Sequence, residues 1–174
     1  MRSKNSGFTL IEGLVTVSII AVLVAIGGPA VLRAQSSVVA AGAVEGSFFT
    51  LQKAKSDAIR SATNILVDFN TGDNWCMGIT DQPDCDCTTA NSCTVDGVES
   101  VLSGADFPGM TLDETTFADN QISFDRVRGL PVAGGGSFDM SDSDREVRIS
   151  MNVIGRITVC TVSGELRNYS PCVP

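Results

Sequence analysis

The apolar residues of this chain are gathered into one long run near its N-terminus, at residues 8–32, in which Glu12 is the only charged residue. At ~1.5 Å of rise per residue, a helix of this length spans the ~30 Å hydrocarbon core of a bilayer. Arg2 and Lys4 precede the run, and the positive-inside rule holds them in the cytoplasm. No small-residue cleavage site of the secretory type ends the run. The pattern predicts a transmembrane helix.

The helical pattern continues beyond this run. Gly27-Gly28-Pro29 is expected to weaken or kink the helix, because proline lacks an amide donor and its ring clashes with the preceding turn. Apolar residues then recur three, four and seven residues apart, which predicts a core-facing stripe formed by Ala41, Val44, Phe48, Leu51 and Ala58. Three charged residues are predicted to lie off the stripe, namely Lys53, Asp57 and Arg60. Thr63-Asn64 is the expected stop, because asparagine tolerates a left-handed conformation.

From residue 65 onward the apolar period changes to two, which is typical of strands. The predicted strands are residues 65–69, 75–79, 121–124, 137–140, 146–151 and 156–162, with a weaker candidate at 95–102. The last two flank Asn152-Val153-Ile154-Gly155 and are predicted to form a hairpin. Gly134-Gly135-Gly136 is expected to be a flexible turn, because the lysine and the strand-to-helix context of a P-loop are missing. The sequence therefore predicts an α+β fold, in which a long N-terminal helix packs on a C-terminal antiparallel sheet domain.

Composition and cysteine usage indicate export. The chain has 174 residues, a net charge of −8 and no histidine, and its length leaves room for a single modest domain after the helix. Six cysteines follow the apolar run: Cys76, Cys85, Cys87, Cys93, Cys160 and Cys172. Their number and position are typical of disulfides in an oxidising compartment, and they allow 15 connectivities. With the leader in the cytoplasm, that compartment is the periplasm or beyond.

Two groups of residues contain side chains of the types that bind metals. The first four cysteines follow the spacing C-x8-C, C-x-C and C-x5-C, whereas structural zinc sites prefer C-x2–4-C pairs, so disulfides are favoured. Four acids gather at Asp139, Asp142, Asp144 and Glu146, but the run lacks the glycine and spacing of an EF-hand loop, so a solvated acidic turn is favoured over calcium. No metal or other cofactor is expected.

Glu12 lies inside the predicted membrane segment, where a charge costs ~2.5–3.5 kcal/mol on insertion scales. The acid is therefore a candidate functional residue. The alternative is that it reaches the headgroups and complements the positive end of the helix dipole. From the acid alone, both interpretations stay open.

The stretch Gly7-Phe8-Thr9-Leu10-Ile11-Glu12, followed by the apolar run, closely resembles the N-terminus of type IV pilins and pseudopilins. The resemblance implies that a prepilin peptidase cuts after Gly7 and that the new N-terminal residue, Phe8, is N-methylated. It also implies that Glu12 pairs with the N-terminal amine of a neighbouring subunit in a filament. Other pilins, the prepilin peptidase and the inner membrane are then the expected partners.

Three later segments resemble the GspH/FimT group of minor pilins and pseudopilins: residues 53–60, 122–129 and 149–160. The resemblance implies a leader at 1–7, a helix at 8–62 with 8–32 in the membrane, and a β-rich periplasmic domain at 63–174. A closing disulfide between Cys160 and Cys172 is also implied, and Gly164 and Pro171 permit the chain to double back there. The other cysteines are expected to pair locally.

Three classes of function follow. The favoured one is a minor subunit of a type IV pilus, and its close alternative is a minor pseudopilin of type II secretion. The second class is DNA uptake, because some FimT-like pilins use a Gly-Arg-x-Arg motif. Here the sequence is Gly155-Arg156-Ile157-Thr158, so only Arg156 is kept, and residues 61–120 hold 11 acids and no Lys or Arg, which disfavours phosphate binding. An enzyme is disfavoured by the absence of histidine and of a paired-carboxylate motif.

Overall fold

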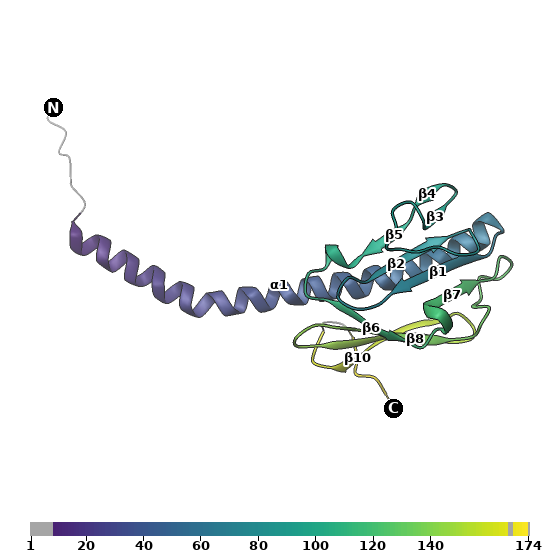
Figure 1. Cartoon of the computed structure of the whole chain (residues 1–174). Helices are drawn as coiled ribbons and strands as arrows, with labels where there is room; N and C mark the ends of the chain where they lie inside the picture. The colour runs from purple at the N-terminus through teal and green to yellow at the C-terminus, as the bar shows by residue number, and fades with distance from the viewer. Residues whose placement is uncertain (1–8, 167–168, 174) are drawn as a thin grey trace. The chain divides into compact units, whose positions relative to one another are not determined.

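The computed structural model describes residues 9–166 and 169–173. The chain divides into two compact units, Met1–Ser37 and Val38–Pro174, and each is described by itself. The long helix α1 (Leu10–Ser61) belongs to both (Figure 1). The remaining elements all lie in the second unit.

The first unit contains the apolar part of α1. The helix begins after Thr9, whose Oγ1 accepts the backbone N–H of Glu12 at 3.3 Å. An 18-residue window of α1 reaches a mean hydropathy of 2.4 with none of it buried, so the helix is long and apolar enough to cross a membrane. Helix is assigned without interruption through Gly27, Gly28 and Pro29, so this sequence does not end α1.

In the second unit, one face of α1 forms part of the core. The predicted stripe is found there, with Val44, Leu51 and Ala58 fully buried, and Ala41 and Phe48 partly buried at its margin. The prediction that Asp57 lies off this face is wrong, because its side chain is only 12% exposed. It is held between Lys53 (4.0 Å) and Arg60 (3.2 Å), the two cations one turn before and after it.

The end of α1 also differs from the prediction. The helix stops at Ser61, and Ala62 takes the left-handed conformation with φ 51°. Asn64 does not take the left-handed position that was predicted for it. Its Oδ1 accepts the backbone N–H of Arg126 at 3.1 Å. The side chain thereby ties the start of the sheet to a loop more than sixty residues later.

Ten strands follow in the described part of the chain, and every pairing between them is antiparallel. The first sheet has the order β5-β2-β1-β7, the second has the order β10-β9-β8-β6, and β3-β4 is a separate hairpin. The strand bounds are β1 (Ile65–Asn70), β2 (Cys76–Thr80), β3 (Thr94–Val95), β4 (Val98–Glu99), β5 (Val101–Ser103), β6 (Thr111–Thr115), β7 (Gln121–Phe124), β8 (Gly136–Ser141), β9 (Glu146–Met151) and β10 (Ile157–Ser163). Two short 3-10 helices are η1 (Gly104–Asp106) and η2 (Ala118–Asn120).

The α+β fold class and the hairpin of β9 and β10 are confirmed. The single strand proposed at 95–102 is wrong, because Asp96 (φ 53°) and Gly97 (φ 76°) turn the chain back between β3 and β4. Positive φ at both central residues is the geometry of a two-residue hairpin turn. Strand β6 was missed, because only Leu112 of its five residues is buried and the sequence therefore shows no alternation.

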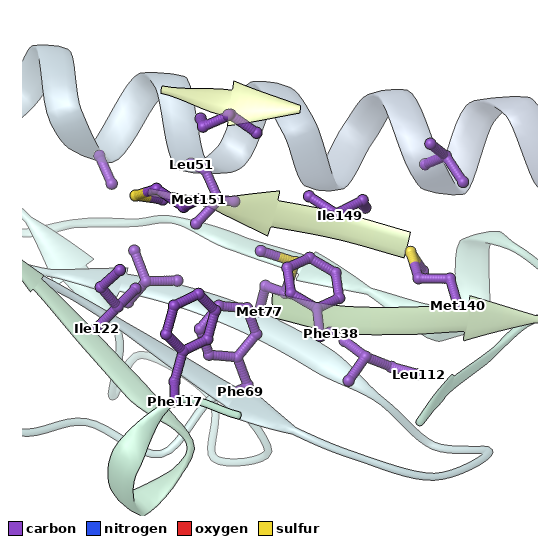
Figure 2. Close-up of a cluster of buried hydrophobic side chains, with 14 of the residues drawn as sticks. Leu51, Phe69, Met77, Leu112, Phe117, Ile122, Phe138, Met140, Ile149 and Met151 are labelled. Atoms are coloured by element: carbon purple, nitrogen blue, oxygen red, sulfur yellow. The ribbon is translucent and has the colours of Figure 1, made fainter. Parts of the chain in front are cut away.

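The core lies between α1 and the two sheets (Figure 2). Phe69 of the first sheet contacts Phe138 of the second, with ring centroids 5.2 Å apart, and stacks on Phe117 at 5.5 Å. Gly134-Gly135-Gly136 was expected to be a flexible turn. Its last two glycines instead pack closely against other parts of the chain. A Cβ at Gly136 would lie 2.4 Å from the Phe117 ring, and one at Gly135 would lie 2.3 Å from a backbone oxygen of Met151.

Candidate functional site

Glu12 stands in the first turn of α1 and its side chain is exposed. Thr9 and Glu12 occupy the N-cap and N3 positions of the S/T-x-x-E capping pattern, and the hydrogen bond from the Glu12 N–H to Thr9 Oγ1 is the first half of that motif. Within residues 9–166 and 169–173, no ion pair involves the Glu12 carboxylate. Gly7 and Phe8, the predicted processing residues, lie outside the described residues.

The six cysteines form three disulfides: Cys76–Cys87, Cys85–Cys93 and Cys160–Cys172. The first two are interlaced, since Cys85 lies inside the loop closed by Cys76–Cys87 and its partner lies outside. All four cysteines of this pair are buried and form a small cluster of their own. A sulfur already bonded to another sulfur is no thiolate, so these residues do not offer metal ligands.

Two residues that the sequence analysis did not single out make this cluster possible. Gly78 on β2 leaves room for it, because a Cβ there would lie 2.3 Å from the sulfur of Cys93 and 2.9 Å from the Cβ of Cys87. Asp68 on the neighbouring β1 accepts the backbone N–H of Cys87 at 3.2 Å. A glycine inside an otherwise apolar strand was the signal that could have shown a close approach here.

The third disulfide holds the C-terminal segment along the open edge of β10. The N–H of Thr161 donates to the carbonyl oxygen of Ser170 at 3.0 Å, and the N–H of Cys172 donates to that of Thr161 at 2.9 Å. The segment extends the second sheet at this edge through a parallel bridge between Thr161 and Pro171. The bond between Cys160 and Cys172 fixes this pairing covalently.

The predicted acidic turn at residues 139–146 is not simply solvated. Asp142 pairs with Arg145 at 3.0 Å, with side chains only 9% and 8% exposed. Asp139 receives two hydrogen bonds from the guanidinium of Arg148, at 2.7 and 2.6 Å, and this carboxylate raises the pKa of Arg148. Two of the four acids are therefore paired with arginines, one with Arg145 just before β9 and one with Arg148 of β9.

Arg156 lies in the turn between β9 and β10, with an exposed side chain. Its backbone N–H donates to Asn152 Oδ1 at 2.9 Å, so the turn is fixed by its own first residue. Thr158 stands where the Gly-Arg-x-Arg motif has its second arginine, and its hydroxyl lies 3.1 Å from that of Ser150 on β9. Only one cation of that motif is present.

These features define a class of protein. A long N-terminal helix with an exposed apolar part, continued into a domain of antiparallel sheets closed by disulfides, is the architecture of a pilin or pseudopilin subunit. Residues 2–28 match the Prokaryotic N-terminal methylation motif. Residues 49–155, more than half of the chain, match the family Type II transport protein GspH, and the chain belongs to this family. The family is one of structural subunits and is not known as a family of enzymes.

Two crystal structures of the type IV minor pilin FimU of Pseudomonas aeruginosa (strain PAO1) are similar in fold. One, in space group P21, has a TM-score of 0.51 and 17% identity, and the match covers 68% of this chain and 85% of that chain. The other, in space group P65, has a TM-score of 0.49 and 18% identity, and the match covers 68% and 90%. No curated protein gives a match.

Proposed function

We propose that this chain is a minor subunit of a type IV pilus, cleaved after Gly7 by a prepilin peptidase, methylated at Phe8, and assembled through α1. Before assembly it is a single-pass protein of the inner membrane, with the sheet domain in the periplasm. The alternative is a minor pseudopilin of type II secretion, which fits the family description, Type II transport protein GspH.

The observation that carries the proposal is Glu12, a lone acid in the exposed apolar part of α1 with no ion pair in the described part of the chain. A carboxylate in a membrane is costly unless it is paired. Cleavage after Gly7 creates an amine on Phe8, and the amine of a neighbouring subunit is a suitable partner in a low-dielectric filament core. Helix capping by Thr9 uses the backbone N–H of Glu12 and leaves the carboxylate available.

The test replaces Glu12 with glutamine in the full-length protein. Removing one partner of a buried ion pair costs ~3–5 kcal/mol, and each ~1.4 kcal/mol is a factor of ten in an equilibrium constant. E12Q should therefore reach normal membrane levels and be cleaved normally, yet be depleted more than a hundredfold from filaments. The measurements are immunoblots of membranes and filaments, with intact mass for cleavage.

Glu45→Gln is the matched control, because Glu45 is also an exposed acid of α1 but lies in the second unit. E45Q should be incorporated like the wild type. Equal incorporation of E12Q and wild type would show that Glu12 has no role in assembly. Recovery of wild-type protein from sheared surface filaments favours the pilus, whereas its retention in the periplasm beside secretion components favours the pseudopilus.

A further inference from the structure

The four cysteines at residues 76–93 can form two disulfides in three ways. Consecutive pairing would join Cys76 to Cys85 and Cys87 to Cys93. Nested pairing would join Cys76 to Cys93 and Cys85 to Cys87. The structure contains the third, interlaced pairing, Cys76–Cys87 and Cys85–Cys93. Each native disulfide therefore encloses one cysteine that belongs to the other.

Loop length does not select the interlaced pairing. The native disulfides join cysteines that are 11 and 8 residues apart. In the consecutive pairing these separations would be 9 and 6 residues. Because the probability of loop closure falls as about the 3/2 power of loop length, the consecutive pairing is favoured about twofold in an unfolded chain. The native pairing therefore depends on the folded domain.

Packing within the domain is specific for the interlaced pairing. The backbone N–H of Cys87 donates to Asp68 of β1, and the sulfur of Cys93 lies against Gly78 of β2. Val101 of β5 packs on the cysteine cluster. Strand β2 lies between β1 and β5 in the first sheet, so these contacts are complete only when all three strands have come together. Strand β5 follows the last of the four cysteines in the chain.

In the proposed topology, the chain after α1 enters the periplasm in the order of its sequence. The four cysteines at residues 76–93 arrive before β5 and before every strand of the second sheet. A dithiol oxidase of that compartment, whose own disulfide takes up two electrons and two protons for each disulfide formed, meets Cys76 and Cys85 first. It meets Cys87 and Cys93 next. Oxidation in order of arrival therefore gives the consecutive pairing.

We propose that this chain is a substrate of a periplasmic thiol–disulfide isomerase, which converts the consecutive pairing into the interlaced one before the domain closes. The partner is defined by its chemistry, a reduced cysteine thiolate that attacks disulfides of unfolded chains. The proposal rests on the periplasmic location of the sheet domain given under the proposed function. It does not require assembly into a filament.

The exchange needs three steps and no net oxidation. The isomerase thiolate attacks the sulfur of Cys85 in Cys76–Cys85, forms a mixed disulfide and releases Cys76 as a thiolate. Cys76 attacks the sulfur of Cys87 in Cys87–Cys93, forms the native Cys76–Cys87 bond and releases Cys93. Cys93 then attacks the sulfur of Cys85 in the mixed disulfide, forms Cys85–Cys93 and returns the isomerase thiolate. Two disulfides are present before and after, so electrons and protons balance.

Burial ends the exchange at the native pairing. All four cysteines of the cluster are buried, and Cys93 is fully inaccessible. Because a thiolate must reach the sulfur that it attacks, the folded domain is protected from the same isomerase. Chains with the consecutive pairing lack this packing and stay open to attack. The reaction therefore proceeds toward the interlaced disulfides.

The third disulfide is an internal control. Cys160 and Cys172 are the last two cysteines of the chain, with no other cysteine between them. Oxidation in order of arrival joins them directly in the native way. The Cys160–Cys172 bond should therefore form equally well with and without the isomerase.

The test compares the full-length protein from two hosts that differ only in the periplasmic isomerase. Pulse-labelled protein is alkylated at once, so that later degradation of mispaired chains does not hide them. It is then digested without reduction by a protease that cleaves before aspartate. Asp86 lies between Cys85 and Cys87, so this cleavage separates the two cysteines whose partners are exchanged.

The peptide products distinguish the pairings. The interlaced pairing joins three peptides, residues 73–80, 84–85 and 86–95, whereas the consecutive pairing joins only the first two and leaves a disulfide within the third. The nested pairing gives a three-peptide product of the same mass, which fragmentation in the mass spectrometer separates. Without the isomerase, the interlaced product should fall at least fivefold in favour of the consecutive one. The Cys160–Cys172 product should be unchanged.

Double variants remove the interlacing and provide matched controls. Changing Cys85 and Cys93 to serine leaves Cys76 and Cys87 as the only cysteines of this segment, and their disulfide should form equally in both hosts. Changing Cys76 and Cys87 instead should give the same result for Cys85–Cys93. An isomerase whose resolving cysteine is replaced by serine should be trapped in a mixed disulfide with the wild type, and at least fivefold less with either double variant.

Equal amounts of the interlaced product in both hosts would overturn the proposal and leave the proposed function standing. A dependence on the isomerase that the double variants share would also overturn it, because interlacing would then not be the cause. Six free thiols in both hosts would show that the sheet domain does not reach an oxidising compartment. That result would count against the proposed function as well.

Discussion

The ammonium group of Lys55 on α1 donates a hydrogen bond to the carbonyl oxygen of Gly155, 100 residues later in the chain and 3.2 Å away. Gly155 has φ 69°, so its carbonyl is presented by a backbone conformation that glycine adopts without strain. The bond connects the helix directly to the β9–β10 turn. From the sequence alone, Lys55 would be taken for a surface residue. In the structure it helps to hold the domain together.

Replacing Lys55 with methionine keeps the aliphatic stem and removes this donor. A hydrogen bond to a charged group contributes ~1.5–3 kcal/mol, and partial exposure places this one toward the lower value. K55M should therefore lower the melting temperature of the purified protein by several degrees. Arg156→Met is the control, because the Arg156 side chain is exposed and the turn uses its backbone N–H, which this change keeps. Equal melting of K55M and wild type would show that the bond adds no stability.

Gly78→Ala should disturb the interlaced disulfides. The new Cβ would lie 2.3 Å from the sulfur of Cys93, and neither disulfide has room to move aside because both are buried. Overpacking of this kind costs ~1–3 kcal/mol or more. We expect free thiols in the periplasmic protein, measured by alkylation and mass spectrometry, and an earlier melt. Gly27→Ala, where a Cβ meets nothing within 4 Å, should show neither effect.

Cys160→Ser should leave Cys172 accessible to thiol reagents and release the C-terminal segment from β10. Closing a loop of this size contributes ~3 kcal/mol, so the variant should also melt earlier. The double variant with both residues changed to serine should melt like the single one but take up no label. If Cys172 stays unlabelled in C160S, then Cys172 forms a disulfide with a residue other than Cys160.

The turn that is held by the carboxylate of Asp125 is expected to be sensitive to acid. The backbone N–H of Arg128 lowers the pKa of this carboxyl, and the N–H groups of Leu130 and Val127 and the charge of Arg128 lower it further. Because the folded pKa lies below the unfolded value of ~3.9, the stabilisation is fully present above that value and is lost as the pH falls through the folded pKa. Melting should be constant from pH 7 to about 5 and fall below about pH 4. Asp125→Asn should flatten that fall, whereas Glu114→Gln, at an exposed position of β6, should not.

DNA binding is expected to be weak or absent. Arg156 is the only cation kept from the Gly-Arg-x-Arg motif, and the remaining charge of the chain is acidic. A gel shift with full-length detergent-solubilised protein at moderate salt should show no discrete complex. Tight binding that disappears with Arg156→Ala would instead support DNA uptake as the function.

The sequence predicted those elements whose pattern is local. Strands β7 and β9 have the predicted bounds, because alternate residues such as Ile122 and Phe124, or Val147 and Ile149, are buried in a regular sheet. The apolar helix around Glu12 could be predicted for the same reason, because its length and its single charge are properties of contiguous residues.

Features set by distant contacts could not be predicted in this way. Asp57 is buried although it is charged, and cations one turn away on either side pair with it. Gly78 has no side chain because the sulfur of Cys93, from a later loop, lies against it. Cysteine spacing allowed 15 connectivities, and only the course of the chain through β2 and the following loop selects one. The loop between β7 and β8 and the turn between β9 and β10 are more than twenty residues apart in the sequence, yet both lie against Lys55.

The interlaced disulfides also determine how the protein responds to tension. Without them, the chain between Cys76 and Cys93 could be drawn out to about 60 Å, at about 3.5 Å per residue. With them, the covalent path runs through both disulfides and the two peptide units between Cys85 and Cys87, and it reaches only about 19 Å. A filament that is pulled during retraction or by shear therefore gains little length from this segment, and β2 cannot be peeled away past Cys76 without breaking a covalent bond.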